Sequence, residues 1–571
     1  MILFDHVSIR YSPDRAEPVL TDVDLALDDG QLILVAGRTG SGKSTLLGAI
    51  NGHVPHFTGG VLTGRVEVDG LDTATHPPRE LAHLVGVVSQ DPLAGFVTDT
   101  VEEELAYGME QMGVAAPVMR TRVEETLDIL GLADLRSRPL RALSGGQQQR
   151  AAIGSVLASG VRVLVLDEPT SALDPVSSEE VLAALLRLVH DIGLTVVIAE
   201  HRLERVAAYA DRMILLDGHG RVTEGLTRTI MRTSPLVPPV VDLGRRAGFD
   251  EIPLSVREAR RLAAPLREAL AYHDPTDYPR MPLPHGASSG KELRAGHQSV
   301  LPPADSRRRS PDLVPGLVVI GVRVAYGPIL AVNDVSMTFP AGQVTVLMGR
   351  NGSGKSSLLW ALSGVQKIVS GRFAVDGIPI EHLPVSKVRD LLRLVPQTAS
   401  DLLYLPSVAE ECQAADQDSG SEPGACRAIL DELAPGIDAT THPRDLSDGQ
   451  KLCLVLAVQL TARPRVILLD EPTRGLDYPA KASLAQILAR MAAAGRAVGV
   501  VTHDVEFAAE VADRIAVLAA GEVIQTGEPG EVLGTSALFA PQVAKVVYPR
   551  PWLTAYQVSQ ALDTPETVLG P

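Results

Sequence analysis

Two nearly identical stretches, "GRTGSGKST" (Gly37–Thr45) and "GRNGSGKSS" (Gly349–Ser357), decide how this chain of 571 residues folds. Each has the form G-x-x-x-x-G-K-[ST] and follows an apolar run, "QLILVA" in the first case and "QVTVLM" in the second. A glycine-rich loop between a buried strand and a helix points its backbone N–H groups at a phosphate, and the helix N-terminus adds partial positive charge. The sequence therefore predicts two phosphate-binding loops.

The residues of the two loops have separate predicted tasks. Lys43 and Lys355 would reach the outer phosphates, and the hydroxyl groups of Ser44 and Ser356 would coordinate Mg²⁺. The predicted phosphate-contacting residues of the loops are Gly37, Gly40, Gly42, Lys43, Ser44, Thr45, Gly349, Gly352, Gly354, Lys355, Ser356 and Ser357.

The rest of the chain repeats at an almost constant offset. "GRVEVDG" (64–70) returns as "GRFAVDG" (371–377), and "VLVLDEPTSALD" (163–174) returns as "VILLDEPTRGLD" (466–477). This pattern indicates a tandem duplication of a module of about 230 residues. We predict a first module at 1–230, a linker with a short helix at 231–315, a second module at 316–546 and a C-terminal tail at 547–571.

The order of the motifs reveals a family resemblance. In each half the phosphate loop is followed by a glutamine, an LSGGQ-type signature, an LDEP strand end, a SALD-type loop and a late histidine. This order resembles the ATPase of an ABC transporter. The resemblance implies an α/β fold with two tandem P-loop NTPase modules, each a mixed-sheet RecA-like core with a helical subdomain, joined by a Pro-rich linker. It also implies an enzyme that hydrolyses ATP with Mg²⁺.

Residues beyond the loops can be assigned roles on this basis. Asp167 ends an aliphatic strand and would hold Mg²⁺, and Glu168 follows at the mouth of the strand, placed to polarise the attacking water as a general base. The resemblance implies that His201 contacts the γ-phosphate and this water, and that Gln90 senses Mg²⁺ and water at a hinge. Tyr11 would stack on adenine or is a plain edge-strand aromatic. The matching residues of the second half are Asp470, Glu471, His503, Gln397 and Tyr326.

The signatures imply that the two halves pair head to tail within one chain, because in this family one module's signature closes the other module's site. The residues with this predicted task are Ser144, Gly145 and Gly146 in the first half and Ser447 and Gly449 in the second. Asp448 stands where the first half has Gly145. Two like charges about 4 Å apart repel by up to ~4 kcal/mol at an effective dielectric of 20, so we expect unequal sites unless this carboxylate turns to solvent.

Composition limits the wider role. The net charge of −17 argues against nucleic acid as the main partner, because neutralising phosphates requires a basic face. No apolar run reaches 18 residues, so the sequence predicts no membrane-spanning helix. The N-terminal "MILFDHVSIR" has the alternation of a strand and not the pattern of a signal peptide. We expect a peripheral protein at the cytoplasmic face of the cell membrane.

The stretch "SQDPLAGFVTDTVEEELAYGMEQMG" (89–113) resembles the ATPases of energy-coupling-factor (ECF) importers. The resemblance implies two membrane partners, a transmembrane T-type coupling subunit and a small substrate-binding protein, and a vitamin, vitamin precursor or transition metal as cargo. Acidic residues after "DTV" would meet arginines of the T subunit, or would stabilise a helix N-terminus. They are Glu102, Glu103 and Glu104, with Glu410 and Glu411 in the second half.

Two other functions compete with this interpretation. A fused double ATPase of a sugar-type importer is the main alternative. An ABC-F translation factor also carries two modules, but the family's connector is a long, charged helical hairpin, whereas this connector is broken by prolines.

The connector and the tail give weaker signals. Ser255 and Glu258 have the spacing of a capping box, and the apolar periodicity that follows is interrupted by Pro265. We expect a short kinked helix docked on the first module, followed by a flexible linker over 274–315. The tail after Val546 could add a strand or a helix to the second module.

Overall fold

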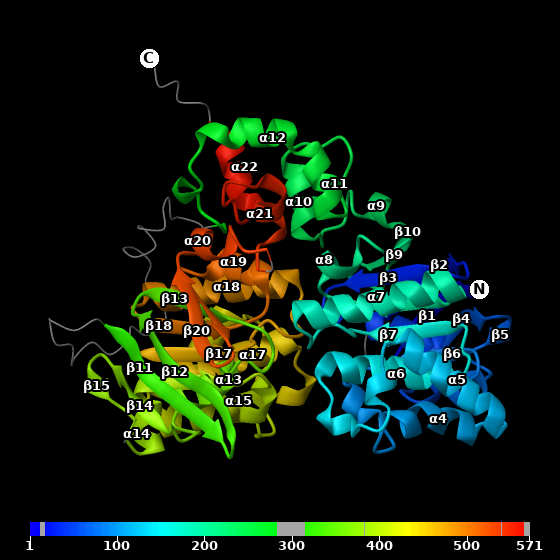
Figure 1. Ribbon diagram of the computed structural model, residues 1–571, viewed down its shortest axis with the longest axis horizontal. Coiled ribbons are helices and arrows are strands. Elements are labelled where there is room, and N and C mark those ends of the chain that lie inside the picture. The colour runs from blue at the N-terminus through cyan, green and yellow to red at the C-terminus, as the bar shows by residue number, and fades with distance from the viewer. Residues whose placement is uncertain (12–17, 283–314, 382, 538, 565–571) are drawn as a thin grey trace. The chain divides into compact units, whose positions relative to one another are not determined.

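The computed structural model describes residues 1–11, 18–282, 315–381, 383–537 and 539–564. It divides into two compact units, Met1–Val241 and Asp242–Pro571 (Figure 1). Each unit contains one copy of the predicted module, and the two phosphate loops lie in different units. The unit boundary falls inside the stretch that the sequence marks as a connector.

The first unit contains two sheets around a shared apolar core. A four-stranded antiparallel sheet has the order β2-β1-β4-β5, and a six-stranded sheet has the order β10-β9-β3-β8-β7-β6 and is parallel except for β10. The strands are β1 (Ile2–Arg10), β2 (Leu20–Leu27), β3 (Leu32–Gly37), β4 (Val61–Val68), β5 (Leu71–Asp72), β6 (Val85–Val88), β7 (Val163–Asp167), β8 (Thr195–Ala199), β9 (Arg212–Leu216) and β10 (Val222–Leu226).

The centre of the six-stranded sheet explains the aliphatic runs in the sequence. Strands β3 and β8 are buried along their whole length, and β7 is buried up to Asp167. Central parallel strands are covered on both faces, so they read as continuous apolar runs and not as alternating ones. The polar residues that follow these runs therefore meet at one edge of the sheet, where the carboxyl ends of the parallel strands lie.

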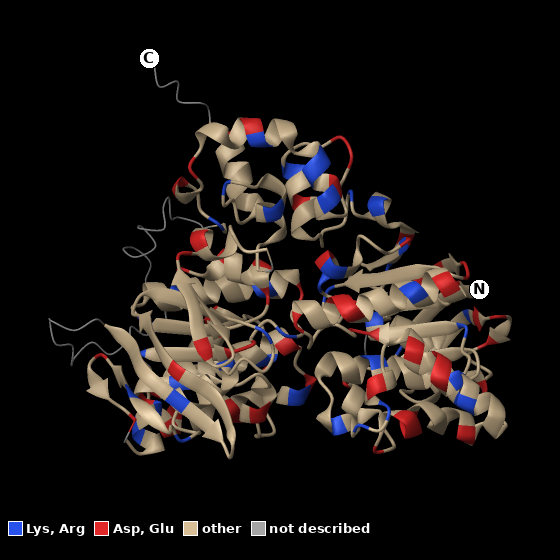
Figure 2. Ribbon diagram, in the orientation of Figure 1, with Lys and Arg blue, Asp and Glu red and all other residues tan. Residues whose placement is uncertain are grey.

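Helices surround this sheet and also form a separate helical layer. The helix α1 (Lys43–Ile50) follows the phosphate loop, and α7 (Pro175–Ile192) and α8 (Leu203–Val206) follow β7 and β8. The helices α4, α5 and α6 pack on one another and form the predicted helical subdomain, on which Figure 2 marks acidic residues in red along the ribbon. Their bounds are Val101–Gln111, Ala116–Ile129 and Gly145–Ala158.

The second unit repeats this architecture. Its sheets have the orders β12-β11-β14-β15 and β16-β17-β18-β13-β19-β20, so each strand takes the place of its counterpart in the first unit. The strands are β11 (Gly316–Tyr326), β12 (Ile329–Pro340), β13 (Gln343–Met348), β14 (Ser370–Val375), β15 (Ile378–Pro379), β16 (Leu392–Val395), β17 (Val466–Asp470), β18 (Ala497–Val501), β19 (Arg514–Ala519) and β20 (Glu522–Gly527). The main helices are α13 (Lys355–Leu362), α15 (Val408–Ser419), α16 (Ala425–Leu433), α17 (Asp448–Thr461), α18 (Tyr478–Ala493) and α19 (Val505–Val511).

The connector does not dock where the sequence suggested. Its helices are α10 (Pro239–Arg246), α11 (Val256–Leu262) and α12 (Ala264–Ala269). The guanidinium groups of Arg260 and Arg267 donate to the carbonyl oxygens of Lys545 and Val546, at 2.6 and 3.3 Å. These carbonyls lie in the last turn of α21 (Gln542–Val547), where a helix leaves acceptors free and favours positive charge. The prediction that this helix docks on the first module is wrong, because it packs on α21 at the end of the second module.

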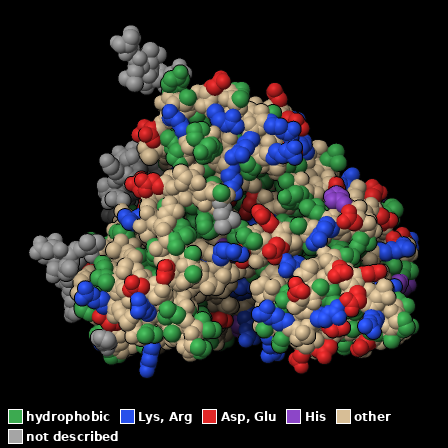
Figure 3. All heavy atoms as spheres, in the orientation of Figure 1, with side chains coloured by type: hydrophobic (Ala, Val, Ile, Leu, Met, Phe, Trp, Pro, Cys, Tyr) green, Lys and Arg blue, Asp and Glu red, His purple; other side chains and the backbone are tan. Residues whose placement is uncertain are grey.

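The local details of the connector follow the sequence more closely. Ser255 caps α11 through the N–H of Glu258, although the Glu258 carboxylate accepts from Leu254 N–H and not from Ser255. The helix is interrupted between α11 and α12, just before Pro265, as the interrupted periodicity predicted. Basic side chains gather over this part of the surface (Figure 3).

The C-terminal tail forms a helix, α22 (Ala555–Asp563), and holds the end of the connector. The Gln557 amide donates to Pro275 carbonyl oxygen at 2.6 Å, and the rings of Tyr278 and the fully buried Trp552 lie 5.7 Å apart. The predicted flexible linker therefore begins too early, because Pro275, Tyr278 and Arg280 contact the tail. Its remainder at 283–314 lies outside the described residues.

Among the residues that the structure describes, none of the helices combines the length and apolarity needed to span a bilayer.

Candidate functional site

Each phosphate loop joins the central strand of a six-stranded sheet to a helix. Gly42 and Gly354 are the N-caps of α1 and α13, with φ angles of 102° and 99°. Only glycine adopts this backbone region at little cost, so the tight entry into both helices depends on these two residues. The N-terminal N–H groups of α1 and α13 are thereby aimed at the space above the loop, which is an anion-binding geometry.

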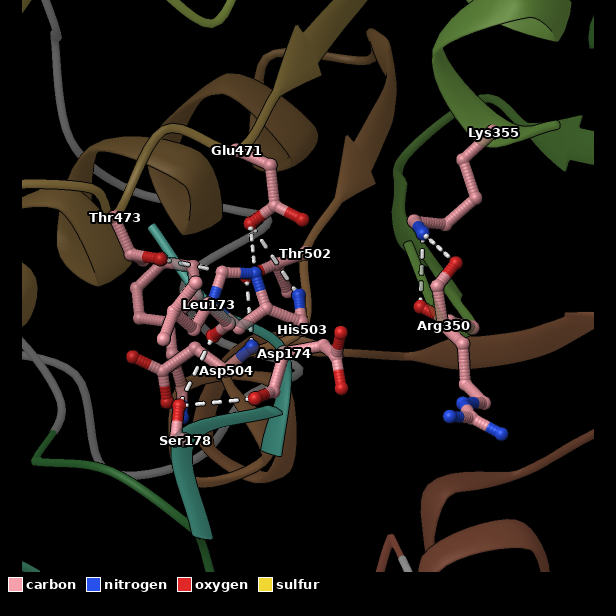
Figure 4. A network of polar contacts seen from close by, with 12 residues as sticks. Leu173, Asp174, Ser178, Arg350, Lys355, Glu471, Thr473, Thr502, His503 and Asp504 are labelled. Carbon is pink, nitrogen blue, oxygen red and sulfur yellow. Dashed lines mark hydrogen bonds and ion pairs between the residues drawn. The ribbon is translucent and has the colours of Figure 1, made fainter. Parts of the chain in front are cut away.

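The lysines of the loops fold back over the backbone. Lys43 Nζ donates to Gly37 and Arg38 carbonyl oxygens at 3.1 and 3.2 Å. Lys355 Nζ makes the equivalent contacts with the backbone of its own loop, both at 2.8 Å, as Figure 4 shows for Arg350. Both lysines are buried, so each ammonium group is held against the backbone of its own loop.

A serine and an aspartate meet beside each loop. Ser44 Oγ donates to Asp167 Oδ2 at 2.9 Å, and Ser356 hydrogen-bonds Asp470 in the same way. Burial raises the pKa of Asp167 and raises that of Asp470 to about 6, and in both cases the neighbouring glutamate adds to the increase. Within the described part of the chain, Asp470 Oδ1 is buried without a hydrogen-bond partner. A hydroxyl beside a buried carboxylate oxygen that lacks a donor suits a small hard cation such as Mg²⁺.

The first half brings three predicted residues together at the carboxyl edge of the sheet. His201 Nε2 lies 2.8 Å from Glu168 Oε1, and Gln90 Nε2 donates to Glu168 Oε2 at 3.3 Å. Gln90 also donates to Ser171 Oγ at 3.3 Å, a contact that the sequence did not reveal. The predicted general base, the histidine and the glutamine therefore form one cluster although they are far apart in the sequence.

The second half forms only part of this cluster. His503 Nδ1 lies 2.8 Å from Glu471 Oε2 (Figure 4). Gln397 is exposed two residues after β16 and makes no side-chain hydrogen bond to any described residue.

In both halves the glutamate has a left-handed backbone, with φ of 50° at Glu168 and 49° at Glu471. Strained positions of this kind in non-glycine residues are concentrated at functional sites.

The two predicted adenine-stacking tyrosines differ in their contacts. Tyr11 directly follows β1, and its hydroxyl donates to Thr45 Oγ1 in α1 at 3.1 Å, so its ring lies next to the phosphate-loop helix. Tyr326 ends β11 and is exposed to the same extent as Tyr11. Both rings remain accessible, as a stacking surface requires.

The signatures begin two matching helices. Ser144 and Ser447 are the N-caps of α6 and α17, and each shares a capping box with the glutamine three residues later. The Asp448 carboxylate lies 3.5 Å from Lys451 Nζ. A Cβ built on Gly475 would lie 2.7 Å from Asp448 Oδ2, so this carboxylate is directed at the SALD-type loop of its own half. The Asp448 side chain is 57% exposed, which favours the alternative of a carboxylate turned to solvent, and Lys451 partly neutralises it.

The acidic residues after "DTV" do not share one role. Glu104 is 5% exposed, and its Oε2 accepts from the N–H groups of Val97 and Thr98 and from the Thr98 hydroxyl at 2.8–3.1 Å. The prediction that it meets a partner arginine is wrong, because it pins the preceding loop. Glu103 completes the capping box of α4, as the alternative proposed, and Glu102 remains half-exposed.

The second half uses the equivalent carboxylate in the same way. Glu411 is buried and accepts from the N–H groups of Tyr404 and Leu405 at 2.6 and 2.7 Å. It too cannot meet a partner arginine. The sequence signal for this role was available, because an identical residue at the repeat offset in two otherwise divergent segments indicates a shared structural contact.

Comparisons with known proteins identify the family of this chain. The ABC transporter family model matches residues 20–171 and 332–474. An ATP-binding protein of Streptomyces avermitilis, provisionally described as belonging to an ABC transporter, is 54% identical over 98% of this chain and 100% of its own length. A similarly described protein of Methanosarcina acetivorans is 30% identical, over 95% of this chain and 89% of its own length. A solved structure of cbiO1 from Clostridium perfringens, part of the ABC transporter complex cbiONQ, is 28% identical over 41% of this chain and 90% of that chain, with a TM-score of 0.37.

The chain therefore belongs to the ABC transporter family, as an ATP-binding protein with two ABC domains in one polypeptide. It is an ATPase of the tandem P-loop α/β class. ATP-binding domains of this family bind ATP, normally together with Mg²⁺.

Proposed function

We propose that the chain is the energy-coupling subunit of an ECF-type importer and hydrolyses ATP at the cytoplasmic face of the cell membrane. The cargo would be a vitamin, a vitamin precursor or a transition metal ion, passed by a T-type membrane subunit and a small substrate-binding membrane protein. The ABC family supports the ATPase part of this proposal. The resemblance of residues 89–113 to ECF ATPases supports the finer class.

The cluster around Glu168 carries the hydrolytic part of the proposal. A carboxylate at the mouth of a buried strand, paired with a histidine at 2.8 Å, is suited to accept the proton of an attacking water. His201 orients this carboxylate and contacts the γ-phosphate. Gln90 links the occupancy of the site to the position of the helical subdomain, through the loop that follows Gln90. In the second half Glu471 and His503 act in the same way, and the head-to-tail completion of each site stays a prediction.

The serine–aspartate pairs are the proposed Mg²⁺ sites. Bound Mg²⁺ neutralises charge on the β- and γ-phosphates of ATP. Ser44 with Asp167 and Ser356 with Asp470 would hold the ion, and the glutamine of each half would approach it. The raised pKa of both aspartates fits this role, because a cation at the site compensates the charge that burial disfavours.

Two matched exposed side chains support coupling to a membrane protein. Val97 is 62% exposed and Tyr404, its counterpart at the repeat offset, is 77% exposed. The backbone N–H of each is fixed by a buried glutamate of the following helix, Glu104 or Glu411. An apolar side chain on a pinned loop presents a rigid anchor at little cost in conformational entropy, which suits a docking position.

The proposal is tested by purifying the tagged chain from detergent-solubilised membranes of the cell that produces it. Recovery of a T-type subunit with a small substrate-binding protein supports the ECF class, and recovery of a permease pair with a sugar-binding protein would contradict it. Val97→Asp with Tyr404→Asp should reduce recovery at least about tenfold while ATP binding persists. Leu226→Asp with Ile524→Asp is the matched control, because these side chains are similarly exposed.

A further inference from the structure

The residue before His201 makes a contact that the roles above do not use. Glu200 is 1% exposed, and its Oε1 accepts from both the backbone N–H and the hydroxyl of Thr170, at 2.9 and 2.6 Å. Thr170 is fully buried and lies two residues after Glu168. One carboxylate oxygen therefore ties the loop that carries the proposed general base to the segment that carries the proposed histidine.

This contact extends the sheet beyond its last backbone bond. Strands β7 and β8 are paired up to Asp167 and Ala199, and Glu168 N–H still donates to Ala199 carbonyl oxygen at 2.9 Å. At the next rung the backbone has turned, and the Glu200 side chain supplies the acceptor instead of a carbonyl group. The left-handed backbone of Glu168 lies between these two rungs, so both of its ends are held.

A second layer of polar contacts supports Thr170, the partner of this carboxyl group. Arg205 Nη1, in α8, donates to Thr170 carbonyl oxygen at 2.7 Å and to Ser178 Oγ at 2.6 Å. The Ser178 hydroxyl in turn donates to Asp174 carbonyl oxygen at 2.9 Å, at the start of α7 (Figure 4). Burial raises the pKa of Glu200, while the Thr170 hydroxyl and Arg205 oppose this increase. The network runs from the loop after Glu168 to the end of the SALD-type loop.

The second half joins the same elements with different chemistry. Thr502 replaces Glu200, and its hydroxyl lies 3.3 Å from the Thr473 hydroxyl. An ion pair also joins two elements of this half, between Lys481 Nζ in α18 and Asp504 Oδ2 at 2.6 Å. Lys481 occupies the position of Ser178 in the repeat. A threonine before the histidine is therefore compatible with this fold, which makes it an informative substitution for Glu200.

We propose that Glu200 is a positioning residue of the first ATP site, which fixes the loop after Glu168 against the segment that carries His201. The inference rests on the roles proposed above for those two residues. Glu200 acts through Thr170 and contacts no nucleotide, so it sets the geometry of the water-activating pair and not the affinity for ATP. A carboxyl group is suited to this task because one of its oxygens can accept the backbone and the hydroxyl hydrogen bonds of Thr170 at once.

The test uses the full chain in a Glu471→Gln background, so that the remaining hydrolysis reports the first site. Glu200→Thr installs the residue of the second half and removes the acceptor from Thr170 N–H. We expect kcat to fall at least about tenfold with KM for ATP unchanged within about twofold, because misplacing a reacting group by 1 Å can cost about a hundredfold in rate. Glu200→Gln keeps an amide oxygen at the acceptor position and should recover most of the turnover.

Three outcomes would overturn the proposal. They are an unchanged kcat in Glu200→Thr, a rise in KM that accounts for the loss, and a loss in Glu200→Gln as large as in Glu200→Thr. Nucleotide titration of each variant gives the fraction of folded sites, so that kcat is counted per competent molecule. Glu168→Gln in the same background must itself abolish hydrolysis. If it does not, the roles proposed for Glu168 and His201 fail, whatever Glu200 does.

Discussion

The buried aspartate of the second site should make the nucleotide-free protein sensitive to pH. Burial raises the pKa of Asp470 from 3.8 to about 6, Glu471 adds to the increase, and the Ser356 hydroxyl opposes it. Because the folded-state pKa lies above the unfolded value, the contribution of Asp470 to stability is complete below about pH 3.8 and is lost as the pH rises through about 6. This loss amounts to about 3 kcal/mol at pH 7 and about 1.5 kcal/mol at pH 5.

Asp470→Asn removes this titration and keeps an oxygen that can accept from Ser356. The new amide N–H groups lack an acceptor where Oδ1 lay, which costs about 1–3 kcal/mol at every pH. The diagnostic quantity is therefore the difference in melting temperature between variant and wild type, measured without nucleotide and Mg²⁺ at pH 5 and pH 7. Between pH 5 and pH 7 the melting temperature of the variant should rise by about 3–6 °C relative to that of the wild type. A change of 1 kcal/mol in stability shifts the melting temperature of a module of this size by about 2–4 °C.

Asp438→Asn is a matched control with the opposite sign. The Thr440 backbone N–H lowers the pKa of Asp438, so its contribution to stability is present above about pH 3.8 and is lost only as the pH falls further. Its difference from the wild type should therefore be the same at pH 5 and pH 7. The account of Asp470 as a carboxylate whose charged form is disfavoured by burial would be refuted in two cases. The difference in melting temperature between Asp470→Asn and the wild type could be the same at both pH values, or it could change so that the wild type becomes relatively more stable at pH 7.

Two further predictions concern carboxylates of known surroundings. Glu104→Ala should lower the melting temperature by several degrees, because two backbone N–H groups and a hydroxyl lose their acceptor, whereas Glu102→Ala should change it by less than a degree; equal effects would contradict the burial of Glu104. Asp448→Gly in the Glu471→Gln background should raise turnover at the first site by up to about tenfold. An unchanged rate in this double variant, with nucleotide binding intact, would show that this carboxylate does not act there.

The sequence could predict the elements whose signals are local. The phosphate loops and the aliphatic strands that end in Asp167 and Asp470 depend on residues a few positions apart. Such patterns can be recognised in the sequence alone, and so can their repetition in the second half. The fold class and the ABC family followed from them and are confirmed. The left-handed backbone at Glu168 was not predictable, because nothing in "LDEP" distinguishes it from an ordinary strand end.

Contacts between distant segments could not be predicted in the same way. Arg260 donates to the carbonyl oxygen of Lys545, which lies 285 positions later in the sequence. The apolar periodicity of one helix does not indicate which other helix it packs against. The acidic run at Glu102 to Glu104 was ambiguous for a different reason. Three adjacent glutamates on a helix point in three directions, so one is buried, one caps and one is exposed, although all three look alike in the sequence.

The two halves solve one backbone problem with different side chains, and this bears on the inequality of the sites. Glu168 and Glu471 adopt the same strained backbone, but the first is backed by a carboxylate that accepts two hydrogen bonds and the second by a pair of hydroxyl groups. The loop after Glu168, the proposed general base of the first site, is therefore tied to the histidine segment by two hydrogen bonds to a carboxylate, and the loop after Glu471 by a contact between two hydroxyl groups. If the halves pair head to tail, this same site also receives the signature that carries Asp448. The two proposed effects have different origins, because Asp448 would add negative charge near the phosphates and Glu200 would fix the geometry of the water-activating pair. Asp448→Gly should then raise turnover at the first site, whereas Glu200→Thr should lower it.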